Sequence, residues 1–299
     1  MVRVLRSPLE AIGCTLLPGF CTLCGSPLPQ FSSAPICDAC WAEVRALDGP
    51  ACTCCGDALD AHSHPADQAR CRACRLAPPG FVRAISFGLY EGRMRGAIHA
   101  LKYGGVQTAA AALGNKLATA AATLANEAPR EMLVIPVPLH RTRYRMRGFN
   151  QTRLLAEHAL AELHNSHPQW KLTLAPRALL RVRATVTQAG LTPRQRRINL
   201  RKAFAVENKG AVTGRDVLLI DDILTTGATV RAASRALLDA GAKTIWVATL
   251  ARARRSNIAN LPEFESTEAE PRTTASVESW PQRQTAVEGI TNHLFRRGD

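Results

Sequence analysis

Cysteine spacing is the feature that most narrows what this chain can fold into. All ten cysteines lie between Cys14 and Cys74, in the first quarter of the 299 residues. Eight of them form pairs with two residues between the partners: Cys21 and Cys24, Cys37 and Cys40, Cys52 and Cys55, and Cys71 and Cys74. Two intervening residues let both thiolates reach one tetrahedral ion, and two such pairs complete a four-thiolate zinc site. The spacing therefore predicts one or two structural zinc ions.

The pairing of these cysteines is open at the level of sequence. Sequential pairing joins the first two pairs in one site and the last two in another, but interleaved pairing fits the spacing equally well. Cys14 and Cys54 are left over, and His62 and His64 are alternative ligands. A disulfide framework is the competing interpretation, and it suits a secreted chain better than one without a secretion signal. Because each predicted site has all four thiolates, we expect zinc to be structural and not catalytic.

The composition changes near Pro78, where strands begin to alternate with helices. Apolar patterns predict strands at 82–90, 132–139, 215–220 and 244–250, and helices at 93–102, 107–127, 149–163 and 229–240. This alternation predicts an α/β domain over 80–252, with a mainly parallel sheet flanked by helices. A small zinc-binding domain over 14–78 precedes it along the chain. The polar stretch over 256–299 lacks periodicity and predicts a disordered tail.

The charge of the chain points to anionic partners. The formal net charge is +14, which favours phosphates, nucleic acid or acidic lipid. Aromatic residues make up only 5% of the chain, so a platform that stacks many bases is not expected. No apolar run is long enough to span a bilayer, and the N-terminus lacks a signal-peptide cleavage site, so we expect a cytoplasmic protein.

The run VLLIDDILTTGAT, from Val217 to Thr229, carries the most specific chemistry. An apolar strand leads into Asp221 and Asp222, placed at the carboxyl end where open α/β sheets bind ligands. A small, hydroxyl-rich turn follows, made of Thr225, Thr226, Gly227, Ala228 and Thr229. Backbone N–H groups of such a turn and the start of the next helix suit a phosphate monoester. The carboxylates suit vicinal ribose hydroxyls or a magnesium ion.

This run resembles the PRPP-binding signature of type I phosphoribosyltransferases, where the acids hold the ribose hydroxyls and the turn holds the 5′-phosphate. Within that superfamily the chain is similar to the ComF (competence protein F, GntX-like) group. The likeness covers about residues 14–252 and rests on the cysteine pairs and on three further stretches: YEGRMRGAIHALKYGG (90–105), IPVPLHRTRYRMRGFNQTRLLA (135–156) and RRINLRKAF (196–204).

The resemblance implies a type I phosphoribosyltransferase fold with a zinc-ribbon head that binds PRPP together with Mg²⁺. It also implies a role in the uptake or processing of single-stranded DNA in natural competence, with PRPP, single-stranded DNA and other DNA-uptake proteins as partners. Catalytic turnover is left open, and the alternative is a non-catalytic nucleic-acid-binding factor that retains the fold. An amidophosphoribosyltransferase would need an N-terminal nucleophilic cysteine, but residue 2 is Val2.

Basic segments extend the predicted site. An exposed loop is predicted to carry four alternating arginines, Arg141, Arg143, Arg145 and Arg147. We expect this loop and Lys102 to lie near the pyrophosphate, with Arg141 and Arg147 in contact with it. A solvated basic loop and a nucleic-acid surface are the alternatives. The segment 191–204 is assigned to a flap or a nucleic-acid surface, with Tyr103 and Phe149 as candidate stacking rings. Acids buried in a salt-bridged interior would argue against an enzyme.

Overall fold

The computed structural model describes residues 19–28, 35–59, 69–183 and 203–254. The chain divides into two units, Met1–Glu263 and Phe264–Asp299, and every described residue belongs to the first. Cys14, His62, His64, the basic residues of 191–202 and the predicted tail all lie outside the described residues. No helix of the described part is long and apolar enough to cross a membrane.

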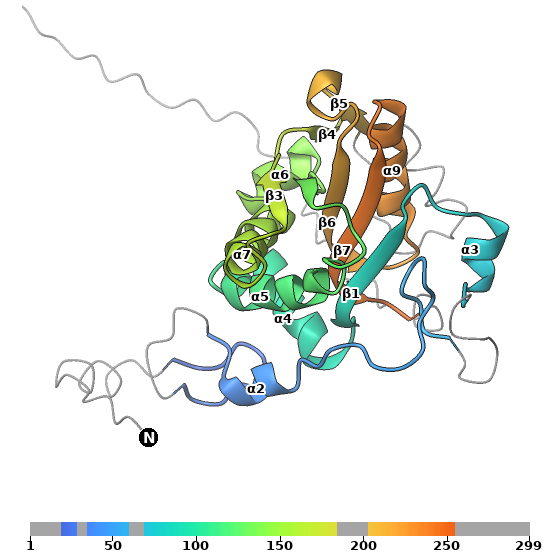
Figure 1. Cartoon of the computed structure of the whole chain (residues 1–299). Helices are drawn as coiled ribbons and strands as arrows, with labels where there is room; N and C mark the ends of the chain where they lie inside the picture. The colour runs from blue at the N-terminus through green and yellow to red at the C-terminus, as the bar shows by residue number, and fades with distance from the viewer. Residues whose placement is uncertain (1–18, 29–34, 60–68, 184–202, 255–299) are drawn as a thin grey trace, which may run out of the picture. The chain divides into compact units, whose positions relative to one another are not determined.

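A five-stranded parallel sheet forms the centre of the first unit (Figure 1). Its strands, in chain order, are β1 (Arg83–Leu89), β2 (Glu131–Pro136), β3 (Lys171–Leu174), β6 (Asp216–Leu224) and β7 (Thr244–Arg252). In space their order is β1-β7-β6-β2-β3, so the two C-terminal strands lie between β1 and β2. A separate antiparallel pair is made by β4 (Leu179–Arg181) and β5 (Phe204–Val206). The predicted parallel α/β sheet is thus confirmed.

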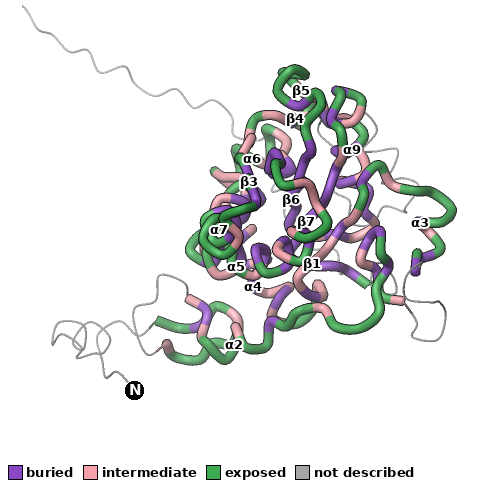
Figure 2. Tube along the Cα trace, viewed as in Figure 1, coloured by how far each residue is buried: buried purple, intermediate pink, exposed green. Residues whose placement is uncertain are grey.

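Helices cover both faces of this sheet. They are α4 (Gly92–Tyr103), α5 (Ala109–Ala122), α6 (Arg141–Arg147), α7 (Gln151–Ser166) and α9 (Ala228–Asp239), with a short 3₁₀ turn at Lys209–Ala211. One core packs α4, α5 and α7 against alternate residues of the sheet such as Leu218 and Trp246. The other packs α9 against the intervening residues, such as Leu219 and Val247. Because both faces are covered, β6 and β7 are buried along nearly their whole length (Figure 2).

Small residues let two of these helices approach closely. Gly114 of α5 faces α7, and a Cβ atom added there would lie 2.4 Å from the Cβ of His158. The glycine at this position of the predicted helix at 107–127 therefore has a packing reason, because a larger side chain at this contact would force α5 away from α7.

The cysteine-rich segment is built from two similar knuckles. In the first, Cys21 N donates to Ser26 O and Gly25 N donates to Cys21 O; in the second, Cys52 and Gly56 make the same bonds one module later. Both glycines have positive φ, 72° and 65°, which a residue with a side chain adopts only with strain. Each knuckle is followed by a one-turn helix, α2 (Asp38–Ala42) or α3 (Arg72–Leu76), which begins directly after the third cysteine of its module.

Candidate functional site

The two adjacent carboxylates lie inside strand β6 and not at its end. The sequence places the strand end at Ile220, but β6 continues to Leu224 because its ladder with β7 runs on to the pair Leu224 and Arg252. Both carboxylates are buried, with 8% of Asp221 and 6% of Asp222 exposed. Consecutive strand residues point to opposite faces, so the two acids occupy different surroundings.

Asp222 is held by two side chains from different helices. Lys102 Nζ at the end of α4 lies 2.8 Å from Asp222 Oδ2, and Gln151 Nε2 at the start of α7 donates to the same oxygen at 2.7 Å. Burial by itself would raise the pKa of Asp222, but the charge and hydrogen bond of Lys102, with the bond from Gln151, hold that pKa below its ordinary value. Asp222 is therefore an ionised carboxylate in a buried ion pair.

Asp221 has the opposite character. Its Oδ1 accepts a hydrogen bond from the backbone N–H of Asp222 at 2.9 Å. Burial, and then the neighbouring charge of Asp222, raise the pKa of Asp221 to about 7, against the opposing charges of Lys102 and Arg181. Two adjacent acids with pKa values pushed apart in this way can hold one proton between them near neutral pH.

Further cations gather around the acids. The guanidinium of Arg147 donates to Gln151 Oε1, and its charge contributes to the low pKa of Asp222. Arg181 on β4 lies within electrostatic reach of Asp221 and stacks on the Phe204 ring, 5.6 Å from its centroid. Burial, and then the charge of Arg143, lower the pKa of Arg181. The acids are therefore enclosed by positive charge.

The four arginines of 141–147 do not form the predicted loop. They lie on the helix α6, which begins after His140, whose side chain accepts from Thr142 N, and ends at Gly148 with φ 79°. On a helix, residues two apart point in nearly opposite directions, whereas residues four apart share a side. Arg143 and Arg147 are half-buried, whereas Arg141 and Arg145 are exposed. The charge of Arg147 acts on Asp222, and that of Arg143 acts on Arg181. The four guanidinium groups therefore do not converge on one point, which corrects the sequence-based expectation.

The turn after β6 leads directly into α9. Gly227 has φ 76° and is the residue before the helix, and Thr226 Oγ1 accepts from Ala228 N at 3.4 Å. Arg231 N donates to Gly227 O at 2.9 Å, so the first turn of α9 begins directly after this glycine. Thr225, Thr226 and Thr229 are partly exposed. The turn therefore lies at the start of α9, and its role as a phosphate cradle stays a prediction.

Sequence reasoning missed several groups at this edge. Gln151 and Arg181 contact or influence the acids, although neither belongs to the thirteen-residue run. His99 Nε2 lies 3.2 Å from Tyr90 OH, and burial, followed by the charges of Lys102 and Arg95, lowers the pKa of His99. No periodic pattern marks these residues, because strand and helix ends bring them together only in the folded chain.

The cysteines form two separate tetrads, which settles the pairing left open by the spacing. Cys21, Cys24, Cys37 and Cys40 make the first cluster, and Cys52, Cys55, Cys71 and Cys74 make the second; within each, the sulfur atoms lie within 4.8 Å of one another. Four thiolates at this spacing fit a tetrahedral zinc ion. Backbone N–H groups support the sulfurs, since Cys37 N donates to Cys21 Sγ and Cys71 N to Cys52 Sγ, both at 3.3 Å.

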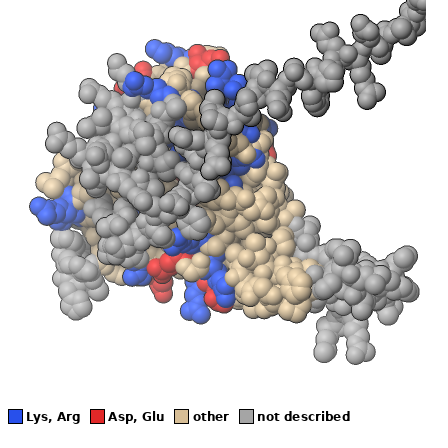
Figure 3. Space-filling model, turned by 180° about the vertical axis from the view of Figure 1, so that it is seen from behind, with Lys and Arg blue, Asp and Glu red and all other residues tan. Residues whose placement is uncertain are grey.

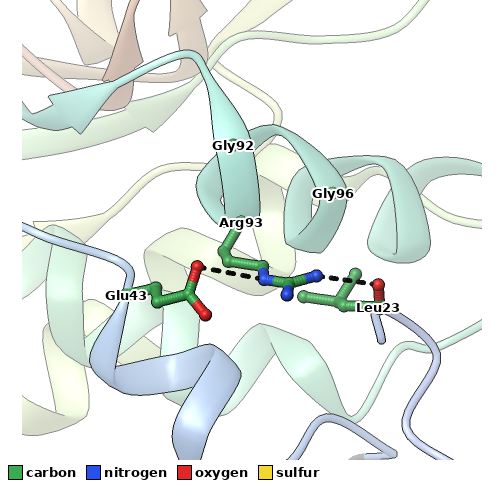
Figure 4. A pocket seen from close by; sticks show the side chains of 5 residues that line it. All are labelled: Leu23, Glu43, Gly92, Arg93 and Gly96. Carbon is green, nitrogen blue, oxygen red and sulfur yellow. Dashed lines mark hydrogen bonds and ion pairs between the residues drawn. The ribbon is translucent and has the colours of Figure 1, made fainter. Parts of the chain in front are cut away.

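A surface hollow lies at the other end of α4 from Lys102. It is lined by Leu23, Glu43, Gly92, Arg93 and Gly96 (Figure 4). Arg93 crosses it, donating from Nε to Glu43 Oε2 at 3.2 Å and from Nη1 to Leu23 O at 2.9 Å. Because the guanidinium ties the first cysteine module to the helix, we interpret this hollow as a docking contact and not as the ligand site.

Comparisons with known proteins agree with this architecture. A double zinc ribbon domain matches residues 14–75, and a phosphoribosyl transferase domain matches residues 175–264. The chain is 36% identical to the DNA utilization protein YhgH of Escherichia coli O157:H7 over 241 residues, covering 79% of this chain and 98% of that one. The chain belongs to the ComF/GntX family.

Other members of this family match over similar lengths. Competence protein F of Haemophilus influenzae is 29% identical, over 73% of this chain and 90% of its own, and competence protein ComFC of Bacillus subtilis is 26% identical, over 74% and 89%. The double zinc ribbon match and the two tetrads support structural zinc in this ComF/GntX protein.

Proposed function

We propose that this protein binds PRPP near the C-terminal ends of the parallel strands. We further propose that it takes part in the utilization of DNA that the cell has taken up. The observation that carries the proposal is the second half of β6, where two carboxylates lie among cations shortly before the turn that begins α9. PRPP presents a 5′-phosphate, two vicinal hydroxyls and a pyrophosphate. The turn Thr225–Thr229 suits the 5′-phosphate and the acids suit the hydroxyls, while Lys102 and Arg147 suit the pyrophosphate.

Binding would require the ligand-free contacts of Asp222 to change. Its Oδ2 is already occupied by Lys102 and Gln151, so the carboxylate is not a preformed acceptor for ribose hydroxyls. In our proposal the pyrophosphate attracts Lys102 away, and the released carboxylate turns to the sugar. The oxygen-rich acids and the ligand's phosphates fit the preference of Mg²⁺, which would neutralise phosphate charge when bound.

The proposal concerns binding and not turnover. Acids buried in a salt-bridged interior argue against an enzyme; both acids are buried, and Asp222 is paired with Lys102. Displacement of pyrophosphate from C1 would also need a nucleophile, and we identify no acceptor site among the described residues. Hence PRPP serves in this proposal as a ligand, and any transfer reaction would need the edge to open first.

Titration calorimetry tests this function directly. Full-length protein is titrated with PRPP and Mg²⁺, and heat is expected from the wild type but not from Asp221→Asn/Asp222→Asn. Arg235→Gln is a matched control, because Arg235 lies on α9 in an exposed pair with Asp239 and changes the charge without touching the site. Absence of heat from folded wild-type protein would exclude PRPP as the ligand.

The role in DNA use rests on the relatives, whose names are DNA utilization protein and competence protein. We propose that this protein acts in the same process, in the cytoplasm, with single-stranded DNA and DNA-uptake proteins as partners. In the view of Figure 3 the visible lysines and arginines of the described residues lie in separate groups, some of them beside acids.

A direct contact with DNA is the second candidate function, and exposed rings near the site favour it. Tyr103 is 71% exposed and Tyr144 is 51% exposed, the latter on α6 among the arginines. Phe149, by contrast, packs against the core and is not a free stacking surface. Base stacking on aromatic rings beside cations is how proteins hold single strands without sequence preference.

Gel shifts on single-stranded DNA test this contact. The affinity for single-stranded DNA is expected to fall at least about tenfold between about 50 and about 200 mM salt. Tyr144→Ala is expected to weaken binding, while Arg235→Gln serves again as the control. No shift at low salt would exclude direct binding.

A further inference from the structure

Two arginines lie on either side of the predicted phosphate turn. Arg252 is paired across the sheet with Leu224, the residue before Thr225, and Ala253 N donates to Leu224 O at 3.1 Å. On the other side, Arg231 N donates to Gly227 O at 2.9 Å and so closes the first turn of α9. The backbone at each end of the turn is therefore fixed by, or next to, one of these residues.

The side chains of both arginines reach the second cysteine cluster. Arg252 Nη2 lies 3.8 Å from Cys55 Sγ and 3.2 Å from Asp57 Oδ1. Arg231 Nη2 lies 4.0 Å from Cys74 Sγ, and its Nη1 donates to Ala77 O at 2.8 Å. The turn and the cluster also share one hydrophobic core, which contains Leu224, Ala228 and the four cysteines of the cluster.

Charge balance would link this arrangement to the metal that the cluster can hold. Four thiolates around one Zn²⁺ carry a net charge of −2, and two guanidinium groups balance that charge. Arg252 is only 3% exposed, and its Nε has no hydrogen-bond partner among the described residues. A buried cation that loses its anionic neighbours is strongly unfavourable.

Within the part of the chain that the structure describes, no side-chain contact joins the first cluster to the turn. This cluster docks on α4 through Arg93, and Cys21 and Cys40 pack with the core of α4, α5 and α7 on the opposite face of the sheet from α9. Loss of its metal should leave the turn undisturbed.

We propose that the second cysteine cluster, when it holds zinc, stabilises the backbone of the phosphate turn. Arg231 and Arg252 are the positioning residues that connect the cluster to the turn. Zinc in this cluster then keeps the backbone of Thr225–Thr229 well ordered, whereas zinc in the first cluster has no effect on that backbone. The functional consequence for sugar-phosphate binding rests on the proposed function above, but the coupling itself does not.

Hydrogen exchange on full-length, zinc-loaded protein tests the coupling without any ligand. Cys55→Ser is expected to speed exchange in the peptide over 225–230 about tenfold, and Cys24→Ser in the first cluster is expected to leave that peptide unchanged. A peptide from β2 reports whether the sheet is intact. Equal exchange at the turn in Cys55→Ser and wild type, or equal acceleration by Cys24→Ser, would overturn the proposal.

Variants in which every cysteine is retained distinguish a loss of coupling from misfolding. Arg231→Gln and Arg252→Lys are expected to release zinc from the second cluster about tenfold faster to a chromophoric chelator, because outer-shell partners of this kind typically contribute that much to metal affinity. Arg235→Gln, one turn further along α9, is the control. Unchanged release would refute the role of the two arginines.

The PRPP titration is then repeated on the variants that remain folded. Weaker binding by Arg231→Gln, with unchanged binding by Arg235→Gln, is the expected result. If wild-type protein gives no heat, the proposed ligand is wrong, and the exchange experiment still decides whether cluster and turn are coupled.

Discussion

The raised pKa of Asp221 predicts that the ligand-free protein loses stability as pH rises. An acid whose folded-state pKa lies above its unfolded value binds its proton more tightly in the folded state. Its contribution is therefore fully present below the ordinary pKa of 3.8 and is lost as the pH rises towards about 7. Asp221→Asn removes this dependence, and the amide oxygen can still accept the hydrogen bond from Asp222 N.

The size of the effect follows from the two pKa values. The interval from 3.8 to about 7 corresponds to at most about 4 kcal/mol, at about 1.36 kcal/mol for each tenfold change in proton affinity. Of this, about 3 kcal/mol falls between pH 5 and pH 8. Relative to Asp221→Asn, the wild type is expected to lose up to that amount of unfolding free energy over this range.

Urea unfolding at several pH values measures the difference. Fluorescence of the buried Trp170 and Trp246 reports on the sheet, and zinc is kept constant so that the cysteine clusters do not contribute. Because both proteins share every other titrating group, the difference between their profiles isolates Asp221. Parallel profiles would show that Asp221 titrates normally, and the account of a proton held between the two acids would be wrong.

Three further predictions address the ion pair, the helix contact and the metal. Lys102→Met leaves Asp222 charged and buried, so urea unfolding should show a loss of about 3–5 kcal/mol, largely restored by adding Asp222→Asn; no loss would mean that the pair opens readily. Gly114→Ala places a Cβ against His158 and should cost about 1–3 kcal/mol by the same assay; an unchanged midpoint would show that α5 and α7 can separate freely. Metal analysis should find about two zinc ions per chain, as the two tetrads indicate, and chelation should lower the thermal midpoint, whereas a metal-free, disulfide-bonded protein that stays folded would contradict the zinc sites.

The sequence predicted four of the five strands of the sheet because these four carry strong local patterns, but it missed the short edge strand β3 (Lys171–Leu174). The apolar run before Asp221 could only be a buried strand, and Gly241 marked the end of α9. The end of β6 was wrong because strand length depends on the partner strand, and the pairing of Leu224 with Arg252 is not visible in local composition. The helix α6 was missed although His140 and Gly148 stand at its ends, because the alternating arginines suggested an extended segment.

The site was predicted as a list of residues but not as an arrangement. The acids, the turn and Lys102 were identified from the motif and the resemblance, whereas the ion pair between Lys102 and Asp222 required the end of α4 to meet β6. Likewise, cysteine spacing predicted two metal sites at most, but only the fold could choose sequential pairing. The roles of the acids, the turn and Lys102 in binding PRPP remain predictions.

The position of Arg252 has a consequence for how the protein is made. Cys55 leaves the ribosome 197 residues before the side chain that it contacts. Among the described strands, β1 likewise pairs only with β7, which is the last of them along the chain. At typical translation speeds this interval lasts about 10–40 s. The N-terminal third of the chain must therefore wait for the C-terminal strand before it can take its final place, so a nascent chain stopped before residue 244 would expose both the metal module and an unpaired strand edge to the cell's proteases and chaperones.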